Sequence, residues 1–321
     1  MKLSQALYGC ARESPGGTPS LRQTSSPGPS SRREMALDWL AWVLSATVIW
    51  GLGTLAAKPS ADRLGPRRMG LGTTLVEGAA FGLIGLLLPR APVPPNPLLA
   101  IAAVSAGGLG AVGYLFFYEG MRVGSVGVVG TISAAAPMLT VVLSVALLSE
   151  TVGSAHIVGI ALIMFCILVL AYEPRRGGTA RRTAVLLGLA GFFVWGVWGF
   201  LVKTSVASLG EGNLDLLLAA GYLGVTVAYA ALPARATRVD DPPTRRSWAL
   251  GGFVFLAGGL SAVALTLAYD FGPAALVAPI SGTYPIIATL GAAAILKEKL
   301  DWRIAVALVA FVLGVVLLAG A

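Results

Sequence analysis

The sequence predicts an all-α, polytopic membrane protein with ten transmembrane helices arranged as two inverted five-helix repeats. Three observations lead to this prediction. Of the 321 residues, 56% are hydrophobic and 12% are charged, whereas a soluble domain carries about twice that charged fraction. Apolar segments long enough to cross a membrane follow one another from Met35 to the end of the chain. The two halves of the chain also share residue types at a nearly constant spacing.

Composition excludes several other classes of protein. The 41 glycines and 19 prolines show no three-residue period, which excludes a collagen-like chain. Two cysteines, Cys10 and Cys166, and a single histidine, His156, cannot build a disulfide framework, a thiolate metal site or a histidine cluster. We therefore expect no metal and no cofactor. The net charge of +8 comes from arginines between apolar segments, as in membrane loops, so nucleic acid is not an expected partner.

Residues 1–34 differ from the rest of the chain. They are rich in Ser, Pro, Gly and Arg, and such a segment cannot bury enough apolar surface to fold. We expect a disordered basic tail outside the fold. It lacks the apolar core of a signal peptide. Two alternatives stay open: translation begins at Met35, or the tail rests near lipid headgroups.

From Met35 onward the chain divides into ten apolar segments. Each has about 18 to 24 residues, enough to cross the hydrocarbon core as a helix. Strands of a membrane barrel would be shorter and would alternate strictly, which these segments do not. Turn residues and charges mark expected connections at 58–63, 89–97, 173–178 and 239–246. The predicted spans are residues 37–57, 71–88, 98–118, 125–148, 153–172, 184–204, 214–232, 248–269, 273–296 and 302–320.

The two halves of the chain resemble each other. With an offset of 148 residues, matching pairs are Gly124 and Gly272, Ser133 and Ser281, Pro137 and Pro285, and Glu150 and Glu298. With an offset of 145, they are Trp50-Gly51 and Trp195-Gly196, and Lys58 and Lys203. Chance supplies one or two such matches but not a run of them in order. We therefore predict two repeats, residues 35–174 and 175–321.

An odd number of crossings in each repeat makes the second repeat enter the membrane from the opposite side. The repeats are then inverted relative to each other, and a substrate site is expected between them near the midplane. Such halves can exchange shapes, so that one gate opens as the other closes.

Several motifs carry a resemblance to a known family. They are Trp50-Gly51…Lys58 with Trp195-Gly196…Lys203, the segments 118–125 and 269–279, and a mid-helix proline followed 13 residues later by Glu150 or Glu298. Over residues 36–320 the chain resembles the drug/metabolite transporter superfamily, in the ten-helix branch with two EamA domains. In the first repeat Ser149-Glu150 replaces the family's usual Gly-Glu, and in the second Lys297-Glu298 does.

The resemblance implies a secondary transporter, an exporter or permease, for a small organic metabolite such as an amino acid or related solute. It implies a multi-pass protein of the plasma membrane that works by alternating access and is not an enzyme. No phosphate-binding loop for ATP is present. Two alternatives stay open: a lipid-carrier flippase of the same fold, and a membrane-embedded enzyme acting on lipid-linked substrates, which would need polar catalytic clusters that the sequence lacks.

The expected partners are membrane lipids and the small-molecule substrate, with protons as an option and a homodimer left open. Orientation also stays open. The positive-inside rule puts the arginine-rich odd-numbered loops in the cytoplasm and the termini outside, whereas the family resemblance implies cytoplasmic termini.

Glu77 lies inside the predicted span 71–88, where a carboxylate costs on the order of 3 kcal/mol. It should face a cavity or a partner, or be protonated. Its functional interpretation is a proton-coupling or substrate-contacting group, and the alternative is a structural carboxyl bonded to a neighbouring helix. Tyr222, at the equivalent place in the second repeat, is not acidic, which favours a substrate-specific role.

Each of the other candidate residues has two interpretations, a structural role or a place on the transport pathway. Lys58 and Lys203 end the first helix of each repeat, where each reaches lipid headgroups or attracts an anionic group. Trp50, Trp195 and Trp198 lie in mid-helix rather than at the interfaces, so each packs between helices or lines a cavity. The tyrosines Tyr114, Tyr118, Tyr269 and Tyr284 have the same two interpretations.

Pro137 and Pro285 remove an amide donor and should bend their helices at the pathway, next to the hydroxyls of Ser133 and Ser281. The sequence Gly108–Gly113 fits a dinucleotide-binding pattern but lies inside an apolar span, so we interpret it as a close-packing helix face. The predicted pathway residues are Trp50, Glu77, Tyr114, Ser133, Pro137, Trp195, Trp198, Lys203, Tyr222, Ser281, Tyr284 and Pro285. We predict no catalytic residue and no metal ligand.

Overall fold

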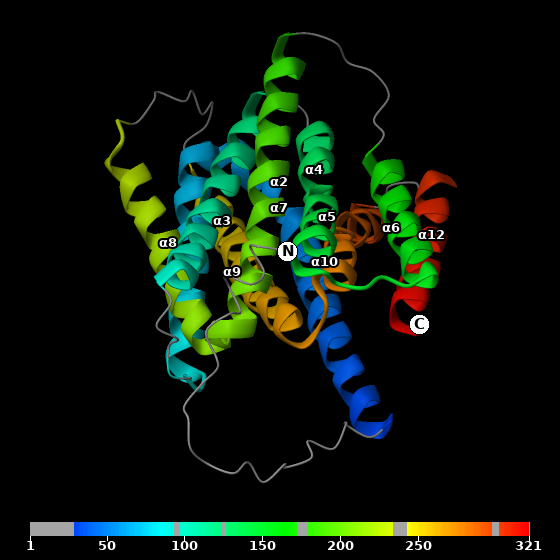
Figure 1. Cartoon of the computed structure of the whole chain (residues 1–321). Helices are drawn as coiled ribbons and strands as arrows, with labels where there is room; N and C mark the ends of the chain where they lie inside the picture. Colours follow the sequence, from blue (N-terminus) through cyan, green and yellow to red (C-terminus); the bar gives the residue numbers. More distant parts are fainter. Residues whose placement is uncertain are drawn as a thin grey trace.

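The computed structural model describes residues 29–90, 92, 97–123, 126–171, 179–233, 243–296 and 302–320. These residues are helical apart from short turns (Figure 1). The helices are α2 (Pro29–Leu87), α3 (Pro97–Val123), α4 (Val126–Ala134), α5 (Ala136–Leu148), α6 (Ser154–Ala171), α7 (Thr179–Leu209), α8 (Glu211–Ala231), α9 (Arg245–Phe271), α10 (Ala274–Ser281), α11 (Tyr284–Leu296) and α12 (Trp302–Gly320).

These helices make ten membrane-crossing segments, as the sequence predicts. Helix α2 supplies two segments because it breaks at Gly65. The pairs α4–α5 and α10–α11 supply one segment each, and every other helix supplies one. Within the described ranges five helices are long and apolar enough to cross a membrane by themselves, and four shorter apolar helices accompany them. The fold is therefore a polytopic all-α membrane protein.

Large apolar side chains cover much of the outer surface. Leu83, Ile101, Val227 and Leu256 are each about 60% exposed or more, and they come from four different helical segments. A soluble protein rarely exposes so much apolar surface. These side chains are placed to contact lipid tails.

The connection predicted at residues 58–63 is wrong. These residues are helical, and the break follows at Gly65, whose φ of 77° and ψ of 159° lie outside the helical region. Glycine adopts this conformation without a steric penalty, and Pro66 then suits the first turn of the next helix. Lys58 and Asp62 pair one turn apart and support the helix across Pro59. The break is therefore set by Gly65-Pro66 rather than by the charged residues before it.

The first helix of each repeat ends in the same way. Gly210, which lies 145 residues after Gly65, has a φ of 73° and a ψ of 157° and separates α7 from α8. The offset equals that of the tryptophan and lysine matches in the sequence. The structure thus repeats the backbone conformation as well as the residue types.

The fourth segment of each repeat is broken near its proline. In the first repeat the amide of Ala135 donates to Ile132 O at 3.3 Å, at the junction of α4 and α5. In the second, the amide of Thr283 donates to Ile280 O at 3.1 Å, between α10 and α11. These positions are 148 residues apart. The bends predicted at Pro137 and Pro285 are confirmed, and each proline lies at the start of the helix after the break.

Packing between equivalent helices shows the inversion. The second half of α2 lies against α8: Gly70 is near Tyr229, Gly78 is near Tyr222, and Gly85 is near Gly212. Residue numbers rise along α2 as they fall along α8, so these equivalent helices are antiparallel. A two-fold axis perpendicular to both, and hence in the membrane plane, relates them. Helices α6 and α12 also pack together, at one side of the molecule (Figure 1).

Two glycines occupy matching places in the repeats. A Cβ atom on Gly51 would lie 2.4 Å from Ile287 Cβ and 2.7 Å from Tyr284 O. On Gly196 it would lie 2.6 Å from Leu139 Cβ and 3.0 Å from Ala136 O. The contacted residues are themselves 148 positions apart. The first helix of each repeat thus crosses the broken helix of its partner repeat in the same way.

The glycine pattern at 108–113 packs helices together, as predicted. A Cβ atom on Gly110 would lie 2.2 Å from the hydroxyl of Tyr222, and one on Gly113 would lie 2.2 Å from Trp195 Nε1. Helix α3 therefore lies in close contact with α8 and α7. Helix α2 begins at Pro29, so the expectation of disorder is wrong for residues 29–34, and residues 1–28 of the expected tail lie outside the described residues.

Candidate functional site

A central cavity lies between the two repeats. The cavity and its open mouth together hold about 970 Å³ of empty space. Its walls come from the first four segments of each repeat. The breaks of both fourth segments border it, through Ala134 and Pro137 in one repeat and Ser281 and Gly282 in the other.

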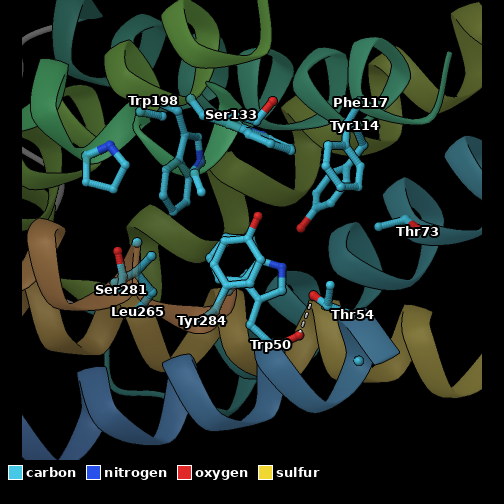
Figure 2. Close-up of a pocket in the computed structure, with 18 of the residues that line it drawn as sticks. Trp50, Thr54, Thr73, Tyr114, Phe117, Ser133, Trp198, Leu265, Ser281 and Tyr284 are labelled. Carbon is cyan, nitrogen blue, oxygen red and sulfur yellow. Dashed lines mark hydrogen bonds between the residues drawn. The ribbon is translucent and has the colours of Figure 1, made fainter. Parts of the chain in front are cut away.

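Nine of the described lining residues of the cavity are aromatic. Trp50 stacks on Tyr284, with ring centroids 5.5 Å apart and an interplanar angle of 21°. Tyr114 meets Trp195 edge to face at 5.1 Å. Figure 2 shows Trp50 and Tyr284 on one side of the open space and Trp198, Ser133 and Tyr114 on the other. Both of these ring pairs join a residue of the first repeat to a residue of the second.

The cavity extends toward the side of the membrane opposite to the chain termini. We name the side that holds the start of α2 and the end of α12 the terminal side. The lining residues Trp50 to Ala57 lie toward the far end of the first segment, before Gly65, and Tyr114 to Tyr118 lie toward the far end of α3. Tyr269, near the terminal-side end of α9, forms the floor.

The described lining residues are uncharged, and two of their polar groups are unused. The indole N–H of Trp198 and the hydroxyl of Ser133 are buried without a hydrogen-bond partner among the described residues. Leaving such a group unpaired costs about 1 to 3 kcal/mol. Both groups are available to a polar atom of a bound solute.

Glu77 lies behind the cavity wall rather than in it. It is fully buried, and Oε1 accepts a hydrogen bond of 2.7 Å from the hydroxyl of Tyr114, which does line the cavity. Oε2 has no hydrogen-bond partner in the described part of the chain. Tyr222 is close enough to interact electrostatically with the carboxyl group. Glu77 and Tyr222 are equivalent positions, so they meet where the pseudo-two-fold axis passes.

A clamp holds the turn between α9 and α10 on the terminal side. The ammonium group of Lys203 donates to Tyr269 O at 2.7 Å and to Gly272 O at 2.8 Å. The carboxylate of Glu150 accepts from the amides of Ala274 and Ala275 at 3.0 and 2.9 Å, at the positive end of α10. Glu150 belongs to the first repeat and the turn to the second, so the clamp joins the repeats.

The equivalent lysine of the first repeat has a different partner. Lys58 pairs with Asp62 on its own helix, and the two side chains are 48% and 56% exposed. Glu298 and residues 124–125, which match Gly272 and Pro273 of the second repeat, lie outside the described residues. The two lysines thus differ in their surroundings although their positions match.

Nine of the twelve predicted pathway residues line the cavity; Glu77, Lys203 and Pro285 do not. Lys203 lies in the clamp, and Pro285 lies beside the cavity residue Tyr284. The described lining also includes residues that the sequence analysis did not single out, among them Thr54, Thr73, Thr140 and Gly258. Only tertiary packing distinguishes these common residue types from their neighbours. No group of metal-ligating side chains occurs among the described residues.

Ten crossing segments in two inverted repeats around a central cavity define a multi-pass membrane transporter of the drug/metabolite type. The chain belongs to the EamA-like transporter family, which matches residues 37–172 and 182–320, one match in each repeat.

Similarity to solved structures supports the fold. One of 26 similar chains, titled "Crystal structure of protein", has a TM-score of 0.66 at 17% sequence identity, over 90% of this chain and 96% of that chain. At this identity the likeness shows the fold alone. Comparison with curated proteins finds no significant match.

Proposed function

We propose that the protein is a secondary transporter that exports a small organic metabolite, such as an amino acid or related solute, across the plasma membrane by alternating access. The single observation that carries this proposal is the central cavity between inverted repeats, which extends toward one side of the membrane and is clamped on the other. The solute binds among the aromatic rings, and its polar group bonds to Trp198 and Ser133. Membrane lipids surround the apolar outer face.

The clamp supports alternating access. Closing the terminal side requires contacts between repeats, which Glu150 makes by binding the turn that Lys203 holds from within the second repeat. An inverted repeat offers a matching set of positions, with Lys58, on the other side. Exchange between the two sets would move the cavity opening from one side to the other without a change of fold.

The proposal is tested by flux in sealed vesicles that contain the purified protein. Candidate solutes are screened without ATP, with and without a pH gradient. We expect saturable flux that a second, unlabelled solute accelerates from the opposite side. Flux at channel-like rates without saturation would contradict alternating access.

Substitution of Trp198 by Phe should weaken solute binding. The ring stays but the N–H donor is lost, and a hydrogen bond is worth about 1 kcal/mol. We expect the solute concentration for half-maximal flux to rise about fivefold, with the maximal rate nearly unchanged. Trp195→Phe is the contrasting variant, because the Trp195 indole already donates to Gly110 O at 3.1 Å. An equal change in both variants would rule out a special role for Trp198.

Glu77→Gln tests proton coupling. Gln retains an oxygen that can accept from Tyr114, so the cavity wall should persist, but the side chain can no longer gain or lose a proton. We expect solute flux without a pH gradient to continue and the stimulation by the gradient to be lost. Unchanged stimulation in this variant would exclude Glu77 as the proton carrier and leave it the role of positioning Tyr114.

A further inference from the structure

Two acidic side chains on α8 are buried outside the central cavity. Glu211 and Asp215 lie one turn apart on the same face, and they are 8% and 0% exposed. None of their four carboxyl oxygens has a hydrogen-bond partner among the described residues. The charge of Glu211 acts on Asp215. Two buried and unpartnered carboxyl groups this close together need a ligand.

The surroundings of the pair are poor in donors. Thr266 of α9 lies beside Glu211, but its hydroxyl donates to Val263 O at 2.8 Å. Asp270, which is exposed, also acts on Glu211 with a like charge. Arg90, which follows the end of α2, has its Cγ atom near Gly212. The Arg90 side chain is exposed, however, and forms no ion pair with either acid in the described structure.

Two negative charges in such a place would be very unfavourable. One proton shared between the carboxyl groups removes one charge and supplies a hydrogen bond between them. The remaining charge lies in the first turn of α8, where the positive end of the helix dipole stabilises it. We propose that Glu211 and Asp215 form a proton-binding site, separate from the central cavity, that exchanges its proton with water on the terminal side near Asp270.

The site lies beside the terminal-side clamp. Asp270 interacts with the ammonium group of Lys203, which holds the turn between α9 and α10. Loss of the proton would place another negative charge near this group. The equivalent positions in the first repeat are Pro66 and Gly70, so the acid pair is not a requirement of the repeated fold. It gives one side of the membrane a proton site that the other lacks.

Infrared spectroscopy of the purified protein tests this site without any solute. All variants carry Glu77→Gln, so that the central carboxyl contributes nothing. At neutral pH we expect the stretching band of a protonated carboxyl group, which shifts in heavy water and disappears at alkaline pH. The double variant Glu211→Gln/Asp215→Asn should lose the band. The control Glu119→Gln, whose carboxylate pairs with Arg122 near the surface, should keep it.

Each other outcome has a definite meaning. A full band in the double variant overturns the proposal. A band that appears only when choline replaces sodium means that the acids bind a sodium ion, which also overturns it. If the double variant does not elute as a single species from size exclusion, Asp215→Glu replaces it in the test. This variant keeps a carboxyl group, so the band should remain but at a shifted frequency. An unshifted band in Asp215→Glu would overturn the proposal. Absence of solute flux in vesicles would contradict the proposed transport function, but it would not affect the infrared evidence for the proton site.

Discussion

Gly221→Val should prevent the protein from folding normally. A Cβ atom on Gly221 of α8 would lie 2.2 Å from Val104 O and 2.6 Å from the amide nitrogen of Gly108, both on α3. Because these are backbone atoms, no side-chain rotation relieves the contact, and the helices must separate. Overpacking costs typically 1 to 3 kcal/mol, and we expect a loss of about 3 kcal/mol here. The yield of monodisperse protein in size-exclusion chromatography and its thermal midpoint measure the effect.

The same helix supplies a matched control. Nothing lies within 4 Å of a Cβ atom on Gly224, which faces outward. Gly224→Val makes the same change in helix propensity without the clash, so its yield and thermal midpoint should stay near those of the parent protein. Similar losses in both variants would mean that α3 and α8 are not in backbone contact.

Lys203→Gln should release the terminal-side clamp. The variant loses the charged donor to Tyr269 O and Gly272 O, and a hydrogen bond to a charged group is worth about 1.5 to 3 kcal/mol. The ratio of open to closed protein on this side should then rise about 10- to 100-fold. The measurement is labelling of a cysteine at Leu265, which lines the cavity, by an impermeant maleimide supplied from the terminal side of sealed vesicles.

Lys58→Gln is the companion variant. Lys58 pairs with Asp62 at an exposed site, and exposed ion pairs contribute about 0 to 1 kcal/mol. Labelling of Leu265→Cys from the terminal side should stay near the parent rate in this variant. Equal acceleration by both substitutions would show that the contacts of Lys203 do not close the cavity.

The differences between the repeats carry the proposed mechanism. Matched positions hold Lys58 and Lys203, yet Lys58 pairs with Asp62 on its own helix, whereas Lys203 donates to Tyr269 O and Gly272 O. The acid pair of α8 has no counterpart, because Pro66 and Gly70 stand in its place. An inverted repeat by itself would make the two sides equivalent. These unmatched residues are therefore where a direction of transport and an ion coupling can arise.

Helix ends show the limit of local sequence patterns. Charges and Pro59 at 58–63 predicted a loop, whereas the helix continues to Gly65. A proline within a helix is tolerated when neighbours satisfy the freed carbonyl, and this depends on packing. The pair Gly65-Pro66 and the glycine at 210 were better signals, since each permits a positive φ directly before a new helix.

Glu77 shows the same limit at the site. Its depth in an apolar span predicted either a cavity or a partner. The structure provides a partner, Tyr114, which itself lines the cavity. The partner comes from a different helix, so no spacing along the chain could have indicated it. Glu211 and Asp215 escaped notice for a related reason, because acids at a helix start are ordinarily exposed.

The sequence alone determined that the chain crosses the membrane ten times in two repeats, because apolar length and a constant spacing of motifs are properties of the linear chain. Tertiary structure decided which of those residues share a cavity, which side of it is clamped and which acids are buried together. These outcomes depend on close approach between distant helices, at Gly51, Gly196 and Gly221. The reason is that burial and hydrogen bonding between helices depend on two segments at once, so the sequence of one segment does not determine them.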